Sequence, residues 1–378
     1  MKAMILAAGR GMRVEPLTDV LPKPMIPLLG KPVMAYLVEH LARHGVTQIM
    51  VNVAHLHEKM EAYFGNGQHY GLEIGYSFEG YATSSGEIVP EPMGSAGGMR
   101  KIHDFSGFFA DTTVVLCGDA LIDLDIIAAV AEHRARGALA TVITQEVASD
   151  KVSRYGVVTT DDSGRVTAFQ ESPPRELTHS HQASTGIYIF EPAVMDLIPA
   201  SAEFDIGSQL LPLMVQRGLP LYAQCRQFSW IDIGTAADYW SAMQALIAGE
   251  VENLPLPGRQ LAPGVHAGLN THIDWTETII EGPVYIGAGT RIDAGAYIIG
   301  PCWIGPGCHI GAGARVVRTV VFSYTRIAPD VELSDSIVCR EHAVGRDGVS
   351  RKRNGGRAMW EDARSLANVG VPGILEAA

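Results

Sequence analysis

The sequence predicts an α/β domain with a mixed, mostly parallel sheet, followed by a short left-handed parallel β-helix. Three observations support this fold class. Strand-like and helix-like runs alternate over the first 250 residues, aliphatic residues then recur at every sixth position, and apolar residues make up 47% of the 378-residue chain. We expect a first domain over 1–250, a proline-rich linker over 251–263, the β-helix over 264–342 and a tail over 343–378.

The alternation of strands and helices predicts the first domain. Compact runs rich in β-branched residues indicate strands at Ala3–Ala7, Gln48–Val53, Thr113–Cys117 and Ala138–Ile143. Two amphipathic stretches, each followed by a glycine, indicate helices at Pro32–His44 and Asp125–Arg136. This alternation is typical of a parallel sheet covered by helices, in which ligands bind beyond the carboxyl ends of the strands. We therefore look for chemistry directly after each predicted strand.

A six-residue repeat predicts the β-helix. Aliphatic side chains stand in one frame at Ile280, Ile286, Ile292, Ile298, Ile304, Ile310 and Val316. Four positions after most of them stand residues of small or modest size, namely Thr290, Ala296, Cys302, Cys308, Ala314 and Val320. In a hexapeptide β-helix each hexad forms one flat face of a triangular coil, with the aliphatic residue inside. Looser matches at Ile273, Ile279, Ile327, Leu333 and Val338 extend the prediction to four or five coils.

The rest of the composition excludes several classes of protein. A net charge of −12 argues against a general nucleic-acid binder. The five cysteines form no C-x-x-C pair, which argues against a zinc site or a disulfide framework. No apolar run is long enough to span a membrane, so we expect a cytoplasmic protein without a membrane partner. The tail adds a basic run at 351–353, which we interpret as solvated surface, and a short predicted helix near 358–367.

The first predicted strand leads into a loop that contains two glycines. It reads Ala8-Gly9-Arg10-Gly11-Met12-Arg13, and Pro22-Lys23-Pro24 follows. Glycines after a strand let backbone N–H groups approach a phosphate chain, and Arg13 and Lys23 can add positive charge. Neither a Walker A motif nor a G-x-G-x-x-G motif is present. Taken alone, the segment fits an ordinary turn equally well.

As a whole this segment resembles the N-terminal motif of the sugar-1-phosphate nucleotidylyltransferases, L-A-A-G-x-G-T-R-L-x-P-L-T followed by P-K-P, with Met12 in place of the threonine. The resemblance implies the Rossmann-like sheet of the nucleotide-diphospho-sugar transferases. It also implies the reaction NTP + sugar 1-phosphate → NDP-sugar + pyrophosphate, with Arg13 and Lys23 as catalytic residues. The residues that it implies for binding the nucleoside triphosphate are Leu6, Ala7, Ala8, Gly9, Gly11, Arg13 and Lys23.

Three further motifs follow in the order of that family. Residues 91–98, EPMGSAGG, resemble the E-P-L-G-T-A-G loop, which faces the base and ribose and opens a helix. This likeness implies nucleotide contacts from Glu91, Gly94, Ser95 and Ala96. Residues 117–119, CGD, and 230–235, WIDIGT, resemble the G-D and W-x-D-I-G-T motifs. They imply a nucleotide contact from Gly118 and Mg²⁺ ligands at Asp119 and Asp232, since Mg²⁺ prefers oxygen ligands. We assign the neighbouring Asp123 and Asp125 to the cap of the next helix.

On the sugar side the sequence departs from the family pattern. Ser172 stands where the family has a lysine that neutralises the sugar phosphate, and Ser184 stands where it has a sugar-binding asparagine. We hypothesise that a nearby basic residue supplies the missing charge: Arg175, Lys151 or Arg154. The residues that the resemblance and this hypothesis place on the sugar phosphate are Gly156, Glu171, Ser172, Arg175, Ser184 and Thr185.

The motifs together look most like bacterial and cyanobacterial mannose-1-phosphate guanylyltransferases. GTP and mannose 1-phosphate are therefore the expected substrates, with UTP, ATP or dTTP and glucose 1-phosphate as the alternative. We expect a homo-oligomer, because β-helix faces commonly pair between subunits. Two other classes stay open. One is a catalytically weak sensor of nucleotide sugars, suggested by Ser172 and Ser184. The other is a bifunctional enzyme whose β-helix transfers acyl groups, with His309 as the base.

Overall fold

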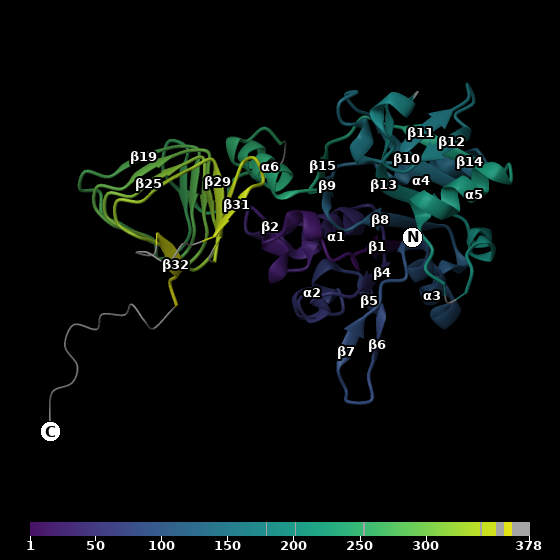
Figure 1. Cartoon of the computed structure of the whole chain (residues 1–378), viewed down its shortest axis with the longest axis horizontal. Coiled ribbons are helices and arrows are strands. Elements are labelled where there is room, and N and C mark those ends of the chain that lie inside the picture. The colour runs from purple at the N-terminus through teal and green to yellow at the C-terminus, as the bar shows by residue number, and fades with distance from the viewer. Residues whose placement is uncertain (179, 201, 252–253, 341, 353–358, 365–378) are drawn as a thin grey trace. The chain divides into compact units, whose positions relative to one another are not determined.

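The computed structural model describes residues 1–178, 180–200, 202–251, 254–340, 342–352 and 359–364 (Figure 1). Contacts divide the chain into two compact units. The first comprises Met1–Met12, Thr18–Ile26 and Lys31–Asp232, and the second comprises Arg13–Leu17, Pro27–Gly30 and the chain from Ile233 onward. The domain boundary at residue 250 stays a prediction. Among the described residues, no helix is both long enough and apolar enough to cross a membrane.

A nine-stranded mixed sheet forms the centre of the first unit. Its strands are β1 (Lys2–Leu6), β4 (Gln48–Val53), β5 (Glu73–Phe78), β8 (Thr113–Cys117), β10 (Ala140–Glu146), β11 (Val157–Thr160), β12 (Val166–Gln170), β13 (Gln182–Phe190) and β14 (Leu221–Cys225). The main order is β12-β11-β13-β8-β1-β4-β5, and β10 pairs with β13 and β14. The strands β8, β1, β4 and β5 are mutually parallel, whereas β13 is antiparallel to β8. The predicted mixed, mostly parallel sheet is confirmed.

Both faces of this sheet are buried, which explains why its strands read as continuous apolar runs. Along β1, Ile5 points into one core with Val51 and Leu116, and Met4 points into the other with Val115. The helices of this unit are α1 (Val33–Arg43), α2 (His57–Phe64), α3 (Ser95–Ser106), α4 (Ile126–Ala135) and α5 (Leu211–Gln216). The two predicted helices correspond to α1 and α4, and the four predicted strands to β1, β4, β8 and β10.

The first unit also contains several short strands outside the central sheet. They are β3 (Lys31–Pro32), the hairpin β6 (Gly80–Ala82) and β7 (Ile88–Pro90), and the antiparallel pair β9 (Ala120–Ile122) and β15 (Trp230–Asp232). Asp125 caps α4, because its Oδ1 accepts a hydrogen bond from Ala128 N at 2.9 Å. The same assignment is wrong for Asp123, whose Oδ1 accepts from Ser229 N at 2.6 Å and so joins the segment before β15.

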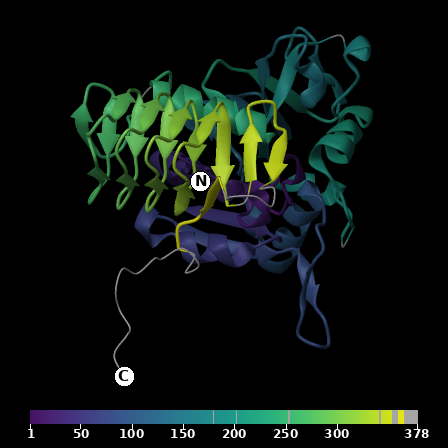
Figure 2. The same ribbon diagram turned by 60° about the vertical axis from the view of Figure 1, so that its left-hand side comes forward.

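The second unit contains β2 (Pro27–Leu28), α6 (Ala236–Ala248) and a parallel β-helix, whose strands Figure 2 shows stacked side by side. One sheet runs through β17 (Val265–Ala267), β20 (Val284–Ile286), β23 (Cys302–Ile304), β26 (Val320–Val321) and β29 (Ser336–Cys339). The next runs through β18 (His272–Ile273), β21 (Arg291–Ile292), β24 (His309–Ile310) and β27 (Thr325–Ile327). The third runs through β19 (Ile279–Glu281), β22 (Tyr297–Ile299), β25 (Arg315–Val317) and β28 (Glu332–Ser334). Residues 265–339 thus form four coils and begin a fifth, as the repeat predicts.

The register of the three sheets explains where the repeat is regular and where it loosens. Ile298 pairs with Val316, eighteen positions on, which is one full coil of three hexads. Ile310 then pairs with Ile327 and Val316 with Leu333, only seventeen positions on. One residue is therefore missing between Val316 and Val321, and a second is missing before Val338, which pairs with Val321, although the aliphatic side chains still point inward. Ile279, at 47% exposure, is the one predicted interior position that proves wrong, and its neighbour Ile280 packs against the core instead.

Antiparallel strands flank the β-helix. β16 (Arg259–Ala262) precedes it, and β30 (His342–Gly345) and β31 (Ser350–Lys352) follow it. The predicted short helix in the tail is wrong where the structure describes it, because β32 (Trp360–Asp362) pairs antiparallel with β27 and buries Trp360. Residues 353–358 and 365–378, with Arg353 of the basic run, lie outside the described residues, as do 252–253 of the predicted linker.

The second unit also holds a piece of the N-terminal chain. The Tyr239 hydroxyl of α6 donates to Pro27 O at 2.8 Å, and the buried Tyr239 ring stacks on Phe322. Gly30, at a φ of 81°, lies against the indole of Trp303, so that a Cβ there would be 3.2 Å from the ring. Residues 27–30 are therefore packed within the second unit, against Tyr239 and Trp303.

Candidate active site

A glycine and a hydroxyl hold the loop after β1 against Thr18 and Lys23. Gly11 has a φ of 72°, and a Cβ there would lie 3.0 Å from both Lys23 Cβ and Thr18 Cγ2. Thr18 Oγ1 donates to Gly11 O at 3.0 Å. Gly9 is exposed and has open space where a side chain would be. Gly11 is thus required to pack the loop against the Lys23 segment, while Gly9 leaves backbone accessible to a ligand.

Ala7 and Ala8, by contrast, are buried, and the Ala7 amide is already occupied by Asn52, whose Oδ1 accepts from Ala7 N at 2.8 Å. Leu6 ends β1, and its carbonyl accepts from Gly118 N at 3.0 Å. A Cβ on Gly118 would lie 2.9 Å from Ile5 Cγ2 and 3.1 Å from Leu6 O. Only glycine lets the segment after β8 pass this close to the end of β1.

Lys23, Asp119 and Asp232 come together at this edge of the sheet. Lys23 Nζ forms an ion pair with Asp119 Oδ2, and the two side chains are only 13% and 20% exposed. Asp232 pairs across β15 and β9 with Ala120, the residue next to Asp119. Burial first, and then the charges of Asp119 and Asp232, raise the pKa of the Cys117 thiol at the end of β8. Both carboxylates therefore lie close enough to the buried Cys117 thiol to raise its pKa.

The donor set fits a hard cation that arrives with phosphate groups. Asp119, in the turn before β9, and Asp232, at the end of β15, would supply part of an oxygen shell, and phosphates and water would supply the rest. Across the described ranges, no group of three or more histidine, cysteine or acidic side chains could hold a metal by itself. Arg13 lies in the turn Met12–Val14, is exposed and belongs to the second unit. Its catalytic role stays a prediction.

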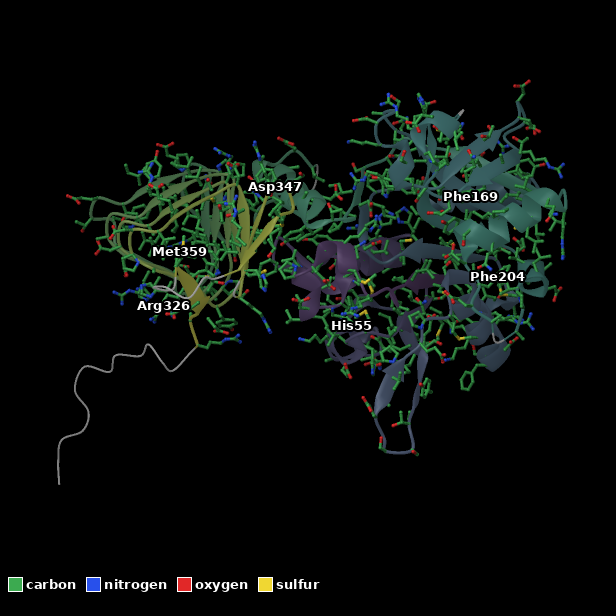
Figure 3. The ribbon with its side chains drawn as sticks, in the orientation of Figure 1. His55, Phe169, Phe204, Arg326, Asp347 and Met359 are labelled. Atoms are coloured by element: carbon green, nitrogen blue, oxygen red, sulfur yellow. The ribbon has the colours of Figure 1, made fainter. Side chains whose placement is uncertain are left out.

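The loop before α3 is fastened to the backbone at Phe204, which Figure 3 labels. Gly97 N donates to Phe204 O at 2.8 Å, and Phe204 N donates to Met93 O at 2.9 Å. Gly94 has a φ of 74°, and a Cβ there would lie 2.6 Å from Phe204 O. The helix begins at Ser95, as the resemblance implies, with Ala96 buried and Glu91 exposed.

The Ser95 hydroxyl connects this loop to an aspartate that the sequence motifs do not include. Ser95 Oγ donates to Asp205 Oδ2 at 2.6 Å and accepts from Ile206 N at 2.8 Å. Burial acts to raise the pKa of Asp205, but hydrogen bonds from Ser95 and Ser208 outweigh it and hold that pKa below its ordinary value. The available signal in the sequence is Asp205 itself, since aspartate is a preferred N-cap residue whose carboxylate accepts from a backbone N–H of the first helical turn.

Three of the predicted sugar-side residues form a cluster with Phe169, which Figure 3 also labels. A Cβ on Gly156 would lie 2.5 Å from Phe169 Cζ and 3.0 Å from Glu171 Oε2. Ser184 is buried, and its amide donates to Gly156 O at 2.8 Å. Partial burial, followed by the charge of Asp205, raises the pKa of Glu171. The Glu171 carboxylate, Gly156 and the Ser184 backbone therefore meet at one place, and the carboxylate is a group that suits the hydroxyls of a sugar.

The remaining predicted residues lie around this cluster. Ser172 has a φ of 43° and its Oγ donates to Glu171 Oε1 at 3.3 Å. Arg175 Nη2 donates to Ser149 Oγ at 3.1 Å, in the loop that also carries Lys151. Thr185 is buried and its hydroxyl donates to Ile143 O at 2.9 Å, so its side chain belongs to the sheet. Two of the three candidate charges, Arg175 and Lys151, are thus on segments that touch.

In the second unit, His309 lies on the outside of the β-helix. Its Nε2 is 2.7 Å from Asp293 Oδ2, and its side chain is 28% exposed. This contact accounts for the position of the imidazole. Acyl transfer with His309 as the base stays a prediction.

Comparison with known proteins gives the class of the protein. Residues 2–249 match the family described as nucleotidyl transferase, and residues 283–318 match the bacterial transferase hexapeptide family, with six repeats. A UTP–glucose-1-phosphate uridylyltransferase of Synechocystis sp. is 50% identical over 369 residues, which is 97% of this chain and 95% of the relative. A mannose-1-phosphate guanylyltransferase of Mycobacterium tuberculosis is 30% identical over 305 residues, 78% of this chain and 79% of the relative.

A solved structure shows the same fold. It is described as a "Putative Glucose-1-Phosphate Thymidylyltransferase" from Bacillus anthracis and aligns with a TM-score of 0.55 at 27% identity, covering 64% of this chain and 94% of its own. The chain belongs to the nucleotidyl transferase family. Within that family it is a sugar-1-phosphate nucleotidyltransferase that carries a hexapeptide-repeat β-helix.

Proposed function

We propose that the protein makes UDP-glucose and pyrophosphate from UTP and glucose 1-phosphate. The 50% identity to the Synechocystis uridylyltransferase, over 97% of this chain, carries this proposal. The proposed substrates are thus the alternative from the sequence analysis and not GTP and mannose 1-phosphate, the pair that the motifs favoured. GTP and mannose 1-phosphate form the second candidate pair, because the mycobacterial guanylyltransferase is 30% identical over 78% of the chain.

In this reaction a phosphate oxygen of glucose 1-phosphate attacks the α-phosphorus of UTP, and the bond from the α-phosphorus to the bridging oxygen breaks. Pyrophosphate takes that oxygen and leaves, so no covalent enzyme intermediate is needed. Catalysis then consists of positioning and charge neutralisation. The backbone at Gly9 and Gly11 would cradle the phosphates, and Lys23 and Arg13 would stabilise the departing pyrophosphate.

Asp119 and Asp232 would hold Mg²⁺, which when bound neutralises charge on the phosphates. Lys23 forms an ion pair with Asp119. We infer that Lys23 gives up this partner when the nucleotide arrives and turns to its phosphates. The same lysine would then serve as the counter-charge of Asp119 before binding and as a phosphate ligand after it.

On the sugar side, Glu171 would accept hydrogen bonds from the hydroxyls of glucose. Arg175 with Lys151 would supply the positive charge that the family takes from a lysine where this chain has Ser172. Arg175→Ala should then raise the KM for glucose 1-phosphate about tenfold or more, and Ser172→Lys in that background should lower it again. If Arg175→Ala leaves this KM unchanged while Ser172→Lys lowers it sharply, Arg175 is not the substitute.

A pyrophosphate-release screen of four nucleoside triphosphates against four sugar 1-phosphates tests the proposal. UTP with glucose 1-phosphate should give the highest kcat/KM, and a parallel preparation of Asp119→Asn controls for contaminating enzymes. A clear preference for GTP with mannose 1-phosphate would establish the second candidate. No turnover with any pair would favour the nucleotide-sugar sensor.

A further inference from the structure

Two buried polar side chains connect the two loops that the proposed function assigns to the nucleotide. Asn52 is 3% exposed and Glu79 is 1% exposed. Asn52 Oδ1 accepts from Ala7 N at 2.8 Å, and Asn52 Nδ2 donates to Glu79 Oε1 at 2.8 Å. Glu79 Oε2 then accepts from Met93 N at 2.9 Å. Three hydrogen bonds thus run without a break from the loop after β1 to the loop before α3.

The donor and the acceptor of each of these three hydrogen bonds are fixed. The backbone amides of Ala7 and Met93 can only donate. Asn52 must therefore turn its oxygen to Ala7, which leaves its amino group for Glu79. Both oxygens of Glu79 are then acceptors, as in an ionised carboxylate. Burial is the largest influence on Glu79 and raises its pKa above the ordinary value, although the hydrogen bonds from Met93 and Asn52 act in the opposite direction.

The Asn52–Glu79 pair is tightly packed by its neighbours. A Cβ on Gly98, in the first turn of α3, would collide with Glu79 Oε1 and lie 3.1 Å from Asn52 Nδ2. The backbone of Glu79 is also engaged, since Glu91 N donates to Glu79 O at 3.0 Å. A buried charged group of this kind contributes little stability over an apolar replacement, but it fixes geometry strongly when all its partners are satisfied.

We propose that the Asn52–Glu79 pair is a positioning device for the nucleoside triphosphate. It sets the separation between the phosphate loop (residues 7–11) and the base loop (residues 91–95), which must hold opposite ends of one molecule. Loosening the pair should weaken the binding of the nucleotide and leave the sugar phosphate unaffected. The inference rests on the proposed function, since it takes the two loops to bind the same nucleotide.

A reciprocal exchange of the two side chains tests the proposal. Glu79→Gln places a donor against Asn52 Nδ2 or against Met93 N, so one of the three hydrogen bonds must break. Asn52→Asp sets two carboxylates against each other. The double variant N52D/E79Q restores all three bonds, because the introduced carboxylate accepts from Ala7 N and from the amino group of the introduced amide, whose oxygen accepts from Met93 N.

We expect E79Q to raise the KM for UTP about tenfold or more with the KM for glucose 1-phosphate within twofold, and the double variant to recover most of this loss. The control is Thr141→Val, which removes the buried hydrogen bond between His133 Nδ1 and Thr141 Oγ1, 2.7 Å long and remote from both loops. It should lower the melting temperature without changing either KM. A double variant no better than E79Q, or an E79Q in which both KM values rise together, would overturn the proposal.

Hydrogen–deuterium exchange separates this inference from the substrate assignment. In the full-length protein, E79Q should speed exchange in the peptides that cover residues 2–12 and 91–98 together, and the double variant should slow both again. This readout needs no substrate, so it holds even if the screen shows no turnover of UTP and glucose 1-phosphate. Faster exchange in only one of the two peptides would show that the pair does not connect the loops.

Discussion

Replacing Gly207 by alanine should impair use of the sugar phosphate without unfolding the protein. Gly207 is buried in the turn Ile206–Leu210, and a Cβ there would collide with Glu171 Oε2 and lie 3.3 Å from Glu171 Cδ. The backbone of Gly207 is not in the left-handed region, so alanine adds no strain of its own. The colliding atom is the end of a side chain, and a shift of about 1 Å in the carboxylate relieves the contact.

The size of the effect follows from that shift. Moving a positioned group by about 1 Å can lower a rate about a hundredfold, which equals about 2.7 kcal/mol at about 1.36 kcal/mol for each tenfold change. We therefore expect kcat/KM for glucose 1-phosphate to fall about a hundredfold. The KM for UTP should stay within about twofold, and the melting temperature should fall by less than about 4 °C.

Steady-state pyrophosphate release at saturating UTP, with glucose 1-phosphate varied, measures this loss. A double-mutant cycle with Glu171→Ala identifies its cause, because Gly207→Ala should have no further effect once the Glu171 carboxylate is gone. Fully additive losses would refute the reasoning, and so would a loss that appears equally in the KM for UTP.

Three further changes have distinct readouts. Asp205→Asn should move the acidic limb of the pH profile of kcat/KM for glucose 1-phosphate to lower pH. Burial and then the Asp205 charge raise the pKa of Glu171. The variant removes the second cause, so the pKa of Glu171 falls and its carboxylate stays ionised at lower pH. An acidic limb that does not move would show that Glu171 is not the group that titrates. Lys23→Met should lower kcat. It should also tighten Mn²⁺ binding, measured by calorimetry without substrates, about fivefold to tenfold, because the ion pair between Lys23 and Asp119 is lost. Unchanged or weaker Mn²⁺ binding would count against a cation site at Asp119. Ile304→Ala should cost about 2–5 kcal/mol in urea unfolding of the second unit, because Ile304 is fully buried there, and a cost below about 1 kcal/mol would contradict the packing described.

The β-helix shows how far a sequence pattern reaches. The hexads from Ile286 to Val316 predict both the coils and the inward side chains, because each face of a coil has the same length and the interior takes an aliphatic residue and a small one from each hexad. The missing residue after Val316 could not be predicted from the repeat. Its place becomes clear only when Ile310 is seen to pair with Ile327.

The candidate site divides in the same way. Lys23, Asp119 and Asp232 are predictable because each stands in a short motif at the end of a strand or loop. Asn52, Glu79 and Asp205 are not, because they act on the backbone of residues that are distant in the sequence. An asparagine inside the apolar run of β4 was the available signal for Asn52, since a buried amide requires partners.

The N-terminal segment enclosed by the second unit bears on the order in which the chain folds. Tyr239 and Pro27 are 212 positions apart, so the contact between them closes a very long loop. Synthesis proceeds from the N-terminus, and residues 27–30 must wait for α6 and for Trp303 before their packing is complete. The segment that immediately follows Lys23 is therefore among the first to be made and among the last to settle. A chain truncated before the β-helix would keep Tyr239 but lose Trp303 and Phe322, so the β-helix is needed to complete the packing around residues 27–30.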